Sequence, residues 1–177
     1  MLLDRKPSIK RQVIVFVHGY QASSFYMEPL SNYLKYKYHN VIPLLSTVNE
    51  GRTEQEIEES AHRLAIEIKN FLNSTPDLKE FDINFICHSM GGLIARACLK
   101  YLQSHKNKFN NFVTICSPHL GYLYHSSTLI STSLWILNKV RKDPSMIELT
   151  MSDSNELDVS FFLDRKLTST IYLYPKN

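Results

Sequence analysis

One serine, Ser89, stands in a sequence context typical of a catalytic nucleophile. It lies in Cys-His-Ser-Met-Gly (87–91), which is the Gly-x-Ser-x-Gly pattern with cysteine at the first glycine position. In that pattern a strand delivers the serine into a sharp turn and a helix leaves at once, so small residues are needed two positions before and after it. Gly91 and Gly92 meet this need, and Cys87 meets it in part. We therefore predict a nucleophile elbow at Ser89.

A structural role for Ser89 is the alternative, because serine is a common N-cap and a helix is predicted over 91–103. Three features favour the nucleophile. A strand pattern precedes the serine, a Gly-Gly pair follows it, and a His-Gly pair ends an earlier strand over 13–17.

Acyl transfer at a serine also needs hydrogen-bond donors for the oxyanion that forms. The helix after Ser89 would aim the backbone N–H of Met90 at that position. We expect the backbone N–H of Tyr20 as the second donor, because the strand over 13–17 ends beside the elbow in a parallel sheet.

Other residues are predicted to shape these turns rather than to react. His88 is next to the nucleophile in sequence and should project away from it. We expect the Cys87 thiol to be buried in the strand, where burial would raise its pKa, so packing is favoured over nucleophilic attack. The supporting set is His18, Gly19, Cys87, His88, Gly91 and Gly92.

The elements that must position these residues alternate along the chain. Continuous apolar runs predict strands, and apolar residues at helical spacing predict helices between them. Pro43 suggests that the second strand lies at an edge, and Thr53 with Glu56 predicts a capping box at the start of the second helix, near residue 57. The predicted strands are 13–17, 41–45, 81–87, 111–117 and 169–174, and the predicted helices are 25–38, 57–72, 91–103 and 129–140.

This alternation predicts an α/β fold, with a mostly parallel sheet of about five strands and helices on both faces. A length of 177 residues suits one domain over 1–177. Residues 118–167 are interpreted as a cap-like insertion over the top edge of the sheet, whose helix over 129–140 could receive an acyl chain or pack as an ordinary core helix.

Composition argues against several classes of function. The 20 basic and 17 acidic residues are scattered, so no nucleic-acid surface is predicted. Cysteines and histidines lack the spacing of a zinc site and no phosphate-binding loop is present, so we expect neither metal nor cofactor. Three cysteines favour free thiols in the cytoplasm. No window is apolar enough for a transmembrane segment; transient membrane-surface contact remains open, and the oligomeric state is not indicated.

Three stretches resemble the lipase-like serine esterases of the α/β-hydrolase superfamily, in their eukaryotic cytosolic branch. They are VFVHGYQASSFYMEPLSNYL, INFICHSMGGLIARACL, and FVTICSPHLGYLYHSSTLISTSLWILNKV with the later SMIELTMSD. The last is the most specific, through Ser-Pro-His-Leu-Gly and Trp135. The resemblance implies an ester hydrolase, acting on a lipid ester, with Ser89 as nucleophile and the backbone of Tyr20 and Met90 as oxyanion hole.

The remaining members of a catalytic triad are not found in the usual order of serine, acid and histidine. No Asp or Glu lies between Ser89 and His125, the last histidine, and the first acidic residue after the serine is Asp143. We interpret His119 and His125 as loop residues. The resemblance places the acid and histidine after the strand over 169–174.

Three explanations stay open: a fragment, a degenerate hydrolase kept for binding or interaction, or completion by another chain. We expect these 177 residues alone to turn over an ester poorly.

Overall fold

Four parallel strands form the sheet in the residues that the computed structural model describes, which are 10–76, 78–119 and 144–145. They are β1 (Arg11–Val17), β2 (Val41–Leu45), β3 (Phe81–His88) and β4 (Phe109–Ile115). Their order is β2-β1-β3-β4, and each pairs with its neighbour in parallel. The predicted α/β class is thus confirmed, while the predicted strand 169–174, the helix 129–140 and nearly all of the 118–167 insertion lie outside the described residues.

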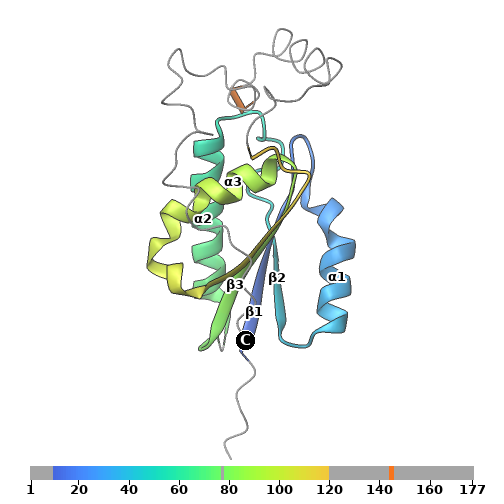
Figure 1. Cartoon of the computed structure of the whole chain (residues 1–177), viewed down its shortest axis with the longest axis vertical. Coiled ribbons are helices and arrows are strands. Elements are labelled where there is room, and N and C mark those ends of the chain that lie inside the picture. The colour runs from blue at the N-terminus through green and yellow to red at the C-terminus, as the bar shows by residue number, and fades with distance from the viewer. Residues whose placement is uncertain (1–9, 77, 120–143, 146–177) are drawn as a thin grey trace, which may run out of the picture.

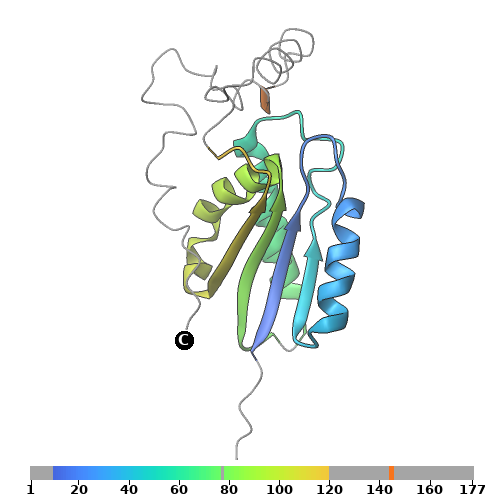
Figure 2. The same ribbon diagram turned by 45° about the vertical axis from the view of Figure 1, so that its right-hand side comes forward.

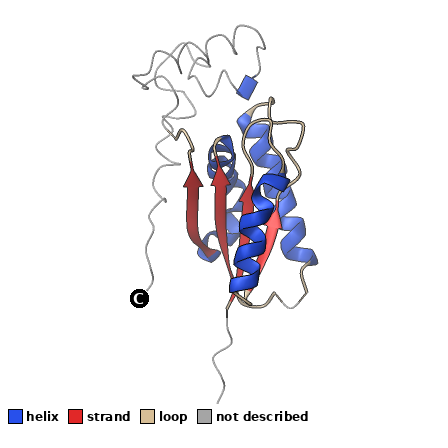
Figure 3. Ribbon diagram, turned by 90° about the vertical axis from the view of Figure 1, so that its right-hand side faces the viewer, coloured by secondary structure: helices blue, strands red, loops and turns tan. Residues whose placement is uncertain are grey.

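Helices cover both faces of this sheet (Figures 1 and 2). A short 3₁₀ helix, η1 (Ser24–Met27), leads into α1 (Glu28–Lys37) on one face. On the other face lie α2 (Ile57–Ser74), α3 (Met90–Cys98) and a second 3₁₀ helix, η2 (Leu99–Lys108). Figure 3 shows α1 in front of the sheet and the helices of the opposite face, α2 and α3, behind it.

Strand β1 lies inside the sheet and is buried on both faces. Val13, Val15 and Val17 belong to the larger core under α2 and α3. Ile14 and Phe16 belong to a smaller core on the α1 side, with Met27 and Val41. A continuous apolar run is what a strand with two covered faces requires, so the sequence pattern over 13–17 predicted this position correctly.

Among the described residues, β2 pairs with β1 alone and lies at an edge of the sheet, as Pro43 predicted. Proline has no N–H to donate to a ladder, and at an edge that donor would have no partner strand on one side. The β1–β2–α1 region therefore follows closely from local sequence signals.

The predicted helix over 91–103 is shorter in the structure. Helix α3 ends at Cys98, and the chain continues as η2 with non-helical torsion angles at Leu102 (φ −110°, ψ 22°). The tighter 3₁₀ turn puts residues three apart on one face. Leu99 and Leu102 both reach the core in this way, with Leu102 fully buried.

The capping box predicted for Thr53 and Glu56 is wrong. Helix α2 begins at Ile57 with Glu56 as its N-cap, and no side chain caps it. Thr53 is buried and its Oγ1 instead accepts a hydrogen bond from the backbone N–H of Gln21 (2.8 Å). The Thr53 hydroxyl therefore accepts a hydrogen bond from a distant residue instead of capping the start of α2.

Among the described residues, every helix is too short or too polar to cross a bilayer.

Candidate active site

Ser89 occupies the single-residue turn between β3 and α3. Strand β3 ends at His88, α3 begins at Met90, and Ser89 has φ 53° and ψ −127°. A positive φ is unfavourable for a residue with a Cβ and persists only where the surroundings enforce it. The half-buried Ser89 side chain makes no capping hydrogen bond to α3. A serine with positive φ between a strand and a helix is what a nucleophile elbow requires, and the N-cap alternative lacks its defining bond. A nucleophilic role for Ser89 stays a prediction.

Two backbone hydrogen bonds hold Ser89 in this conformation. Its N–H donates to the carbonyl oxygen of Ile115 at the end of β4 (2.8 Å). Its own carbonyl oxygen accepts from the N–H of Gly92 in the first turn of α3 (3.1 Å). The serine is thus fixed from the neighbouring strand and from its own helix.

The two glycines after the serine are needed because other parts of the chain touch them. A Cβ on Gly91 would overlap the carbonyl oxygen of His18, and a Cβ on Gly92 would overlap the side chain of Ser117. Close approach of this kind is the reason for small residues in the elbow pattern.

Cys87 takes the place of the pattern's first glycine without disturbing the turn. Its side chain is fully buried in the core under α2 and α3. Burial, with Cys98 nearby, raises the pKa of the Cys87 thiol. A thiol must ionise to attack, so Cys87 is in an unreactive environment.

The loop after β1 lies against the elbow, because β1 and β3 pair with Val17 opposite Cys87. A Cβ on Gly19 would lie 2.9 Å from the Cβ of Ser89. Tyr20 follows directly, and its partly buried side chain packs on the α2/α3 core. Tyr20, in the loop after β1, and Met90, at the start of α3, therefore lie in two segments that meet at Ser89. Donation of their N–H groups to an oxyanion stays a prediction.

Two histidines belong to these turns. His18 is 3% exposed, and its Nδ1 lies 3.0 Å from the carbonyl oxygen of Gly19, so Nδ1 carries the proton in that bond. His88 is exposed at the end of β3. His18 and Gly19 thus form the inner part of the β1 loop, while His88 lies at the surface.

Sequence reasoning missed a set of hydrogen bonds between the loop after β1 and residues 50–54, which we call the brace of the β1 loop. Besides the Thr53 contact to Gln21, the Gln21 side chain donates to Glu54 (2.7 Å) and the Ser24 N–H donates to Glu50 (2.7 Å). The hydrogen bonds from Ser24 hold the pKa of the Glu50 carboxyl below its usual value. Nothing local in residues 50–54 signals this role, because the partners are about 30 positions away.

The loop after β4 carries His119, which faces α3. Its Nε2 lies 3.1 Å from Thr114 Oγ1, and Arg96 Nη1 lies 3.2 Å from its carbonyl oxygen and 3.4 Å from its Nδ1. Burial and the charge of Arg96 lower the pKa of His119. His119 is therefore a loop residue with both ring nitrogens engaged, and His125 lies outside the described residues.

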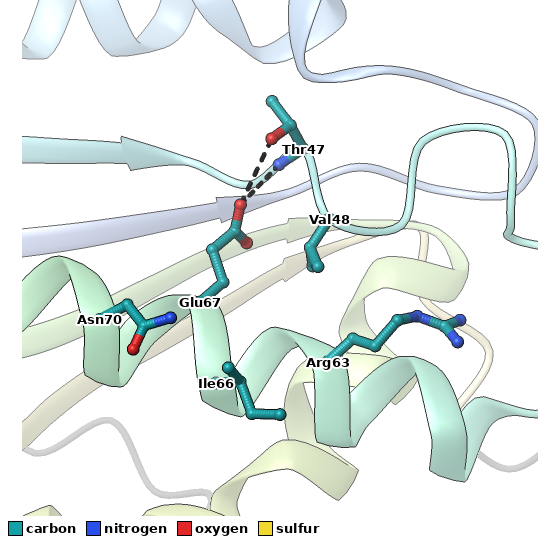
Figure 4. A pocket seen from close by; sticks show the side chains of 6 residues that line it. All are labelled: Thr47, Val48, Arg63, Ile66, Glu67 and Asn70. Atoms are coloured by element: carbon teal, nitrogen blue, oxygen red, sulfur yellow. Dashed lines mark hydrogen bonds between the residues drawn. The ribbon is translucent and has the colours of Figure 1, made fainter.

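A shallow cavity of about 350 Å³ lies elsewhere, between the segment after β2 and helix α2 (Figure 4). Glu67 crosses it to accept a hydrogen bond from the Thr47 N–H (3.0 Å). No elbow residue contributes to its lining, so this cavity is not part of the site around Ser89. Its lining residues are Thr47, Val48, Arg63, Ile66, Glu67 and Asn70.

A parallel sheet with a strained serine between the end of β3 and the start of α3 defines a protein of the α/β-hydrolase class. Residues 7–170 match the model of the family described as "Putative serine esterase (DUF676)". The chain belongs to that family.

Relatives and solved structures agree with this class. Lysosomal thioesterase PPT2 of Mus musculus is 24% identical over 127 residues, which are 68% of this chain and 39% of that protein. Phospholipase PlaB of Legionella pneumophila has a TM-score of 0.59 at 15% identity, covering 80% of this chain and 32% of that one. Lipase BlEst2 of Bacillus licheniformis has a TM-score of 0.53 at 17% identity, covering 83% and 57%. The chain thus spans about two fifths of the length of its thioesterase relative.

Proposed function

We propose that the protein to which this chain belongs is a serine ester hydrolase with Ser89 as its nucleophile. The observation that carries the proposal is the positive φ of a half-buried serine, pressed against Gly19 where β3 passes into α3. Backbone strain of this kind is costly and is typical of catalytic turns. Family membership supports ester hydrolysis in general.

The proposed reaction runs through an acyl-enzyme. Ser89 Oγ attacks the ester carbonyl carbon as a general base takes its proton, and the N–H groups of Tyr20 and Met90 donate hydrogen bonds to the tetrahedral oxyanion. The alcohol leaves with the proton, and water then cleaves the acyl-serine bond by the same steps. We place the base and its acid after the predicted strand 169–174, as the resemblance implies.

A lipid ester is the proposed substrate, with the 118–167 segment acting as the cap over the site. A lipase and a phospholipase share the fold, and a thioesterase shares a quarter of its sequence over the matched region. A cytoplasmic location is proposed with it, supported by three cysteines without disulfide bonds.

A binding or interaction domain without catalysis is the second candidate. It is supported by the two histidines that bind other groups through their rings, His18 at Gly19 and His119 at Arg96 and Thr114. If no base reaches Ser89 in the whole protein, the fold would serve recognition alone.

The test compares full-length protein with its Ser89→Ala variant on short- and long-chain p-nitrophenyl esters and on an acyl thioester. We expect kcat to fall by on the order of 10³-fold or more. Ser104→Ala, at an exposed serine in η2, is the control and should keep full activity. Equal turnover by Ser89→Ala would refute the proposal, and absent turnover with retained lipid binding by both proteins would favour the binding domain.

A further inference from the structure

Arg96 is a buried cation on the helix that starts at the nucleophile. It is 3% exposed on α3, seven positions after Ser89. A guanidinium keeps its charge in a protein, and a charge taken out of water must be hydrogen-bonded to be tolerated. Arg96 meets this need in part through the loop after β4, where its Nη1 donates to the carbonyl oxygen of His119 (3.2 Å).

The same guanidinium defines the tautomer of the His119 ring. Arginine has only donors, so the 3.4 Å approach of Nη1 to His119 Nδ1 requires Nδ1 to be the acceptor. The ring proton then resides on Nε2, which donates to Thr114 Oγ1 on β4 (3.1 Å). His119 is thus a neutral ring joining α3 to β4.

The residues before His119 connect the Arg96–His119 contact to the turn at Ser89. The His119 N–H donates to the carbonyl oxygen of Ser117 (3.0 Å), and Ser117 lies directly on Gly92. Cys116 has a positive φ of 56°, so the chain turns sharply there. Immediately before it is Ile115, whose carbonyl oxygen binds the N–H of Ser89.

A short path of contacts therefore joins the buried arginine to the nucleophile. The first turn of α3 and the end of β4 both bind the backbone of Ser89. The hydrogen bonds between Arg96 and His119 connect these two elements, and we call them the Arg96–His119 tie. If this tie is lost, the end of β4 can shift relative to α3. A displacement of about 1 Å at a reacting group can cost on the order of 100-fold in rate.

We infer that Arg96 and His119 are a pair of positioning residues, which fix Ser89 through the loop after β4 and exchange no proton with substrate. The inference rests on the proposed function, because it assumes that Ser89 reacts.

The kinetic test measures the rate at which a fluorophosphonate labels Ser89 in full-length protein. His119→Gln can still accept from Arg96 and donate to Thr114, so labelling should stay within about 3-fold of the unsubstituted rate. His119→Leu and Arg96→Met each remove the tie and should slow labelling about 10- to 100-fold. The double variant should be no slower than either single one, because both remove the same contact.

Two outcomes would overturn the inference while Ser89 still reacts in the unsubstituted protein. One is His119→Gln as slow as His119→Leu, which would indicate a proton-transfer role. The other is His119→Leu labelled at the full rate. An unreactive Ser89 in the unsubstituted protein would instead refute the proposed function and the inference with it.

A spectroscopic test needs no variant to fold. Long-range ¹H–¹⁵N NMR correlations in the unsubstituted full-length protein should show His119 with an unprotonated Nδ1 and a protonated Nε2. A proton on Nδ1 at neutral pH would contradict the inference.

Discussion

The carbonyl oxygen of His18 lies so close to Gly91 that a side chain at position 91 would overlap it. His18 directly follows β1, and Gly91 is in the first turn of α3. One contact between two backbones therefore sets the distance between the loop that carries Tyr20 and the helix that carries Met90.

We predict that Gly91→Ala destabilises the protein and slows labelling of Ser89. The new Cβ would meet backbone that cannot rotate away, and overpacking of this kind costs about 3 kcal/mol. Gly51→Ala is the matched control, because position 51 has open space around it and only its φ of 66° opposes a side chain. That change should cost about 1 kcal/mol. Urea unfolding measures both, and equal losses would contradict the predicted close contact.

We predict that Thr53→Val lowers catalytic efficiency although Thr53 is not in the elbow. Valine keeps the shape but leaves the Gln21 N–H without the acceptor it has at 2.8 Å, which costs about 1–3 kcal/mol. The β1 loop should loosen, and kcat/KM should fall about 10-fold or more as Tyr20 moves. Thr47→Val, at an exposed threonine, should change neither the β1 loop nor kcat/KM. Ester hydrolysis by Thr53→Val at the unsubstituted rate would count against the brace.

We predict that stability falls in mild acid through His119. Burial and the charge of Arg96 on α3 hold the pKa of His119 below its ordinary value of 6.5, and Thr114 on β4 accepts a hydrogen bond from the other ring nitrogen. The unfolded chain then binds a proton more readily than the folded one, so this contribution is complete above pH 6.5 and is lost as the pH falls through the folded pKa.

Urea midpoints at pH 7.5 and pH 5.5 check this. The drop between them should be smaller in His119→Gln than in the unsubstituted protein. An identical drop in the two proteins would show that His119 does not contribute.

Local patterns predicted the parts of the fold in which burial alone decides the structure. The apolar run of β1 and the edge position of Pro43 follow from hydrogen bonding and two-sided coverage. The turn at Ser89 was also predicted, because a strand, a serine and Gly-Gly together leave few conformations.

Contacts between distant residues could not be predicted in this way. Thr53 carries a sound local capping signal, yet its hydroxyl binds Gln21, 32 positions earlier. Arg96 lies in a helical pattern that gives no indication that it meets His119, 23 positions later. In both cases the sequence shows the donor or acceptor, while its partner depends on how the elements pack.

The most direct test of the account is the site of a covalent adduct. Full-length protein would be treated with a fluorophosphonate, digested, and sequenced by tandem mass spectrometry. The account predicts a phosphonylated Ser89 in the peptide containing residues 85–96, and no adduct after Ser89→Ala. A stoichiometric adduct on another serine, or none at all in an ester-hydrolysing preparation, would contradict it.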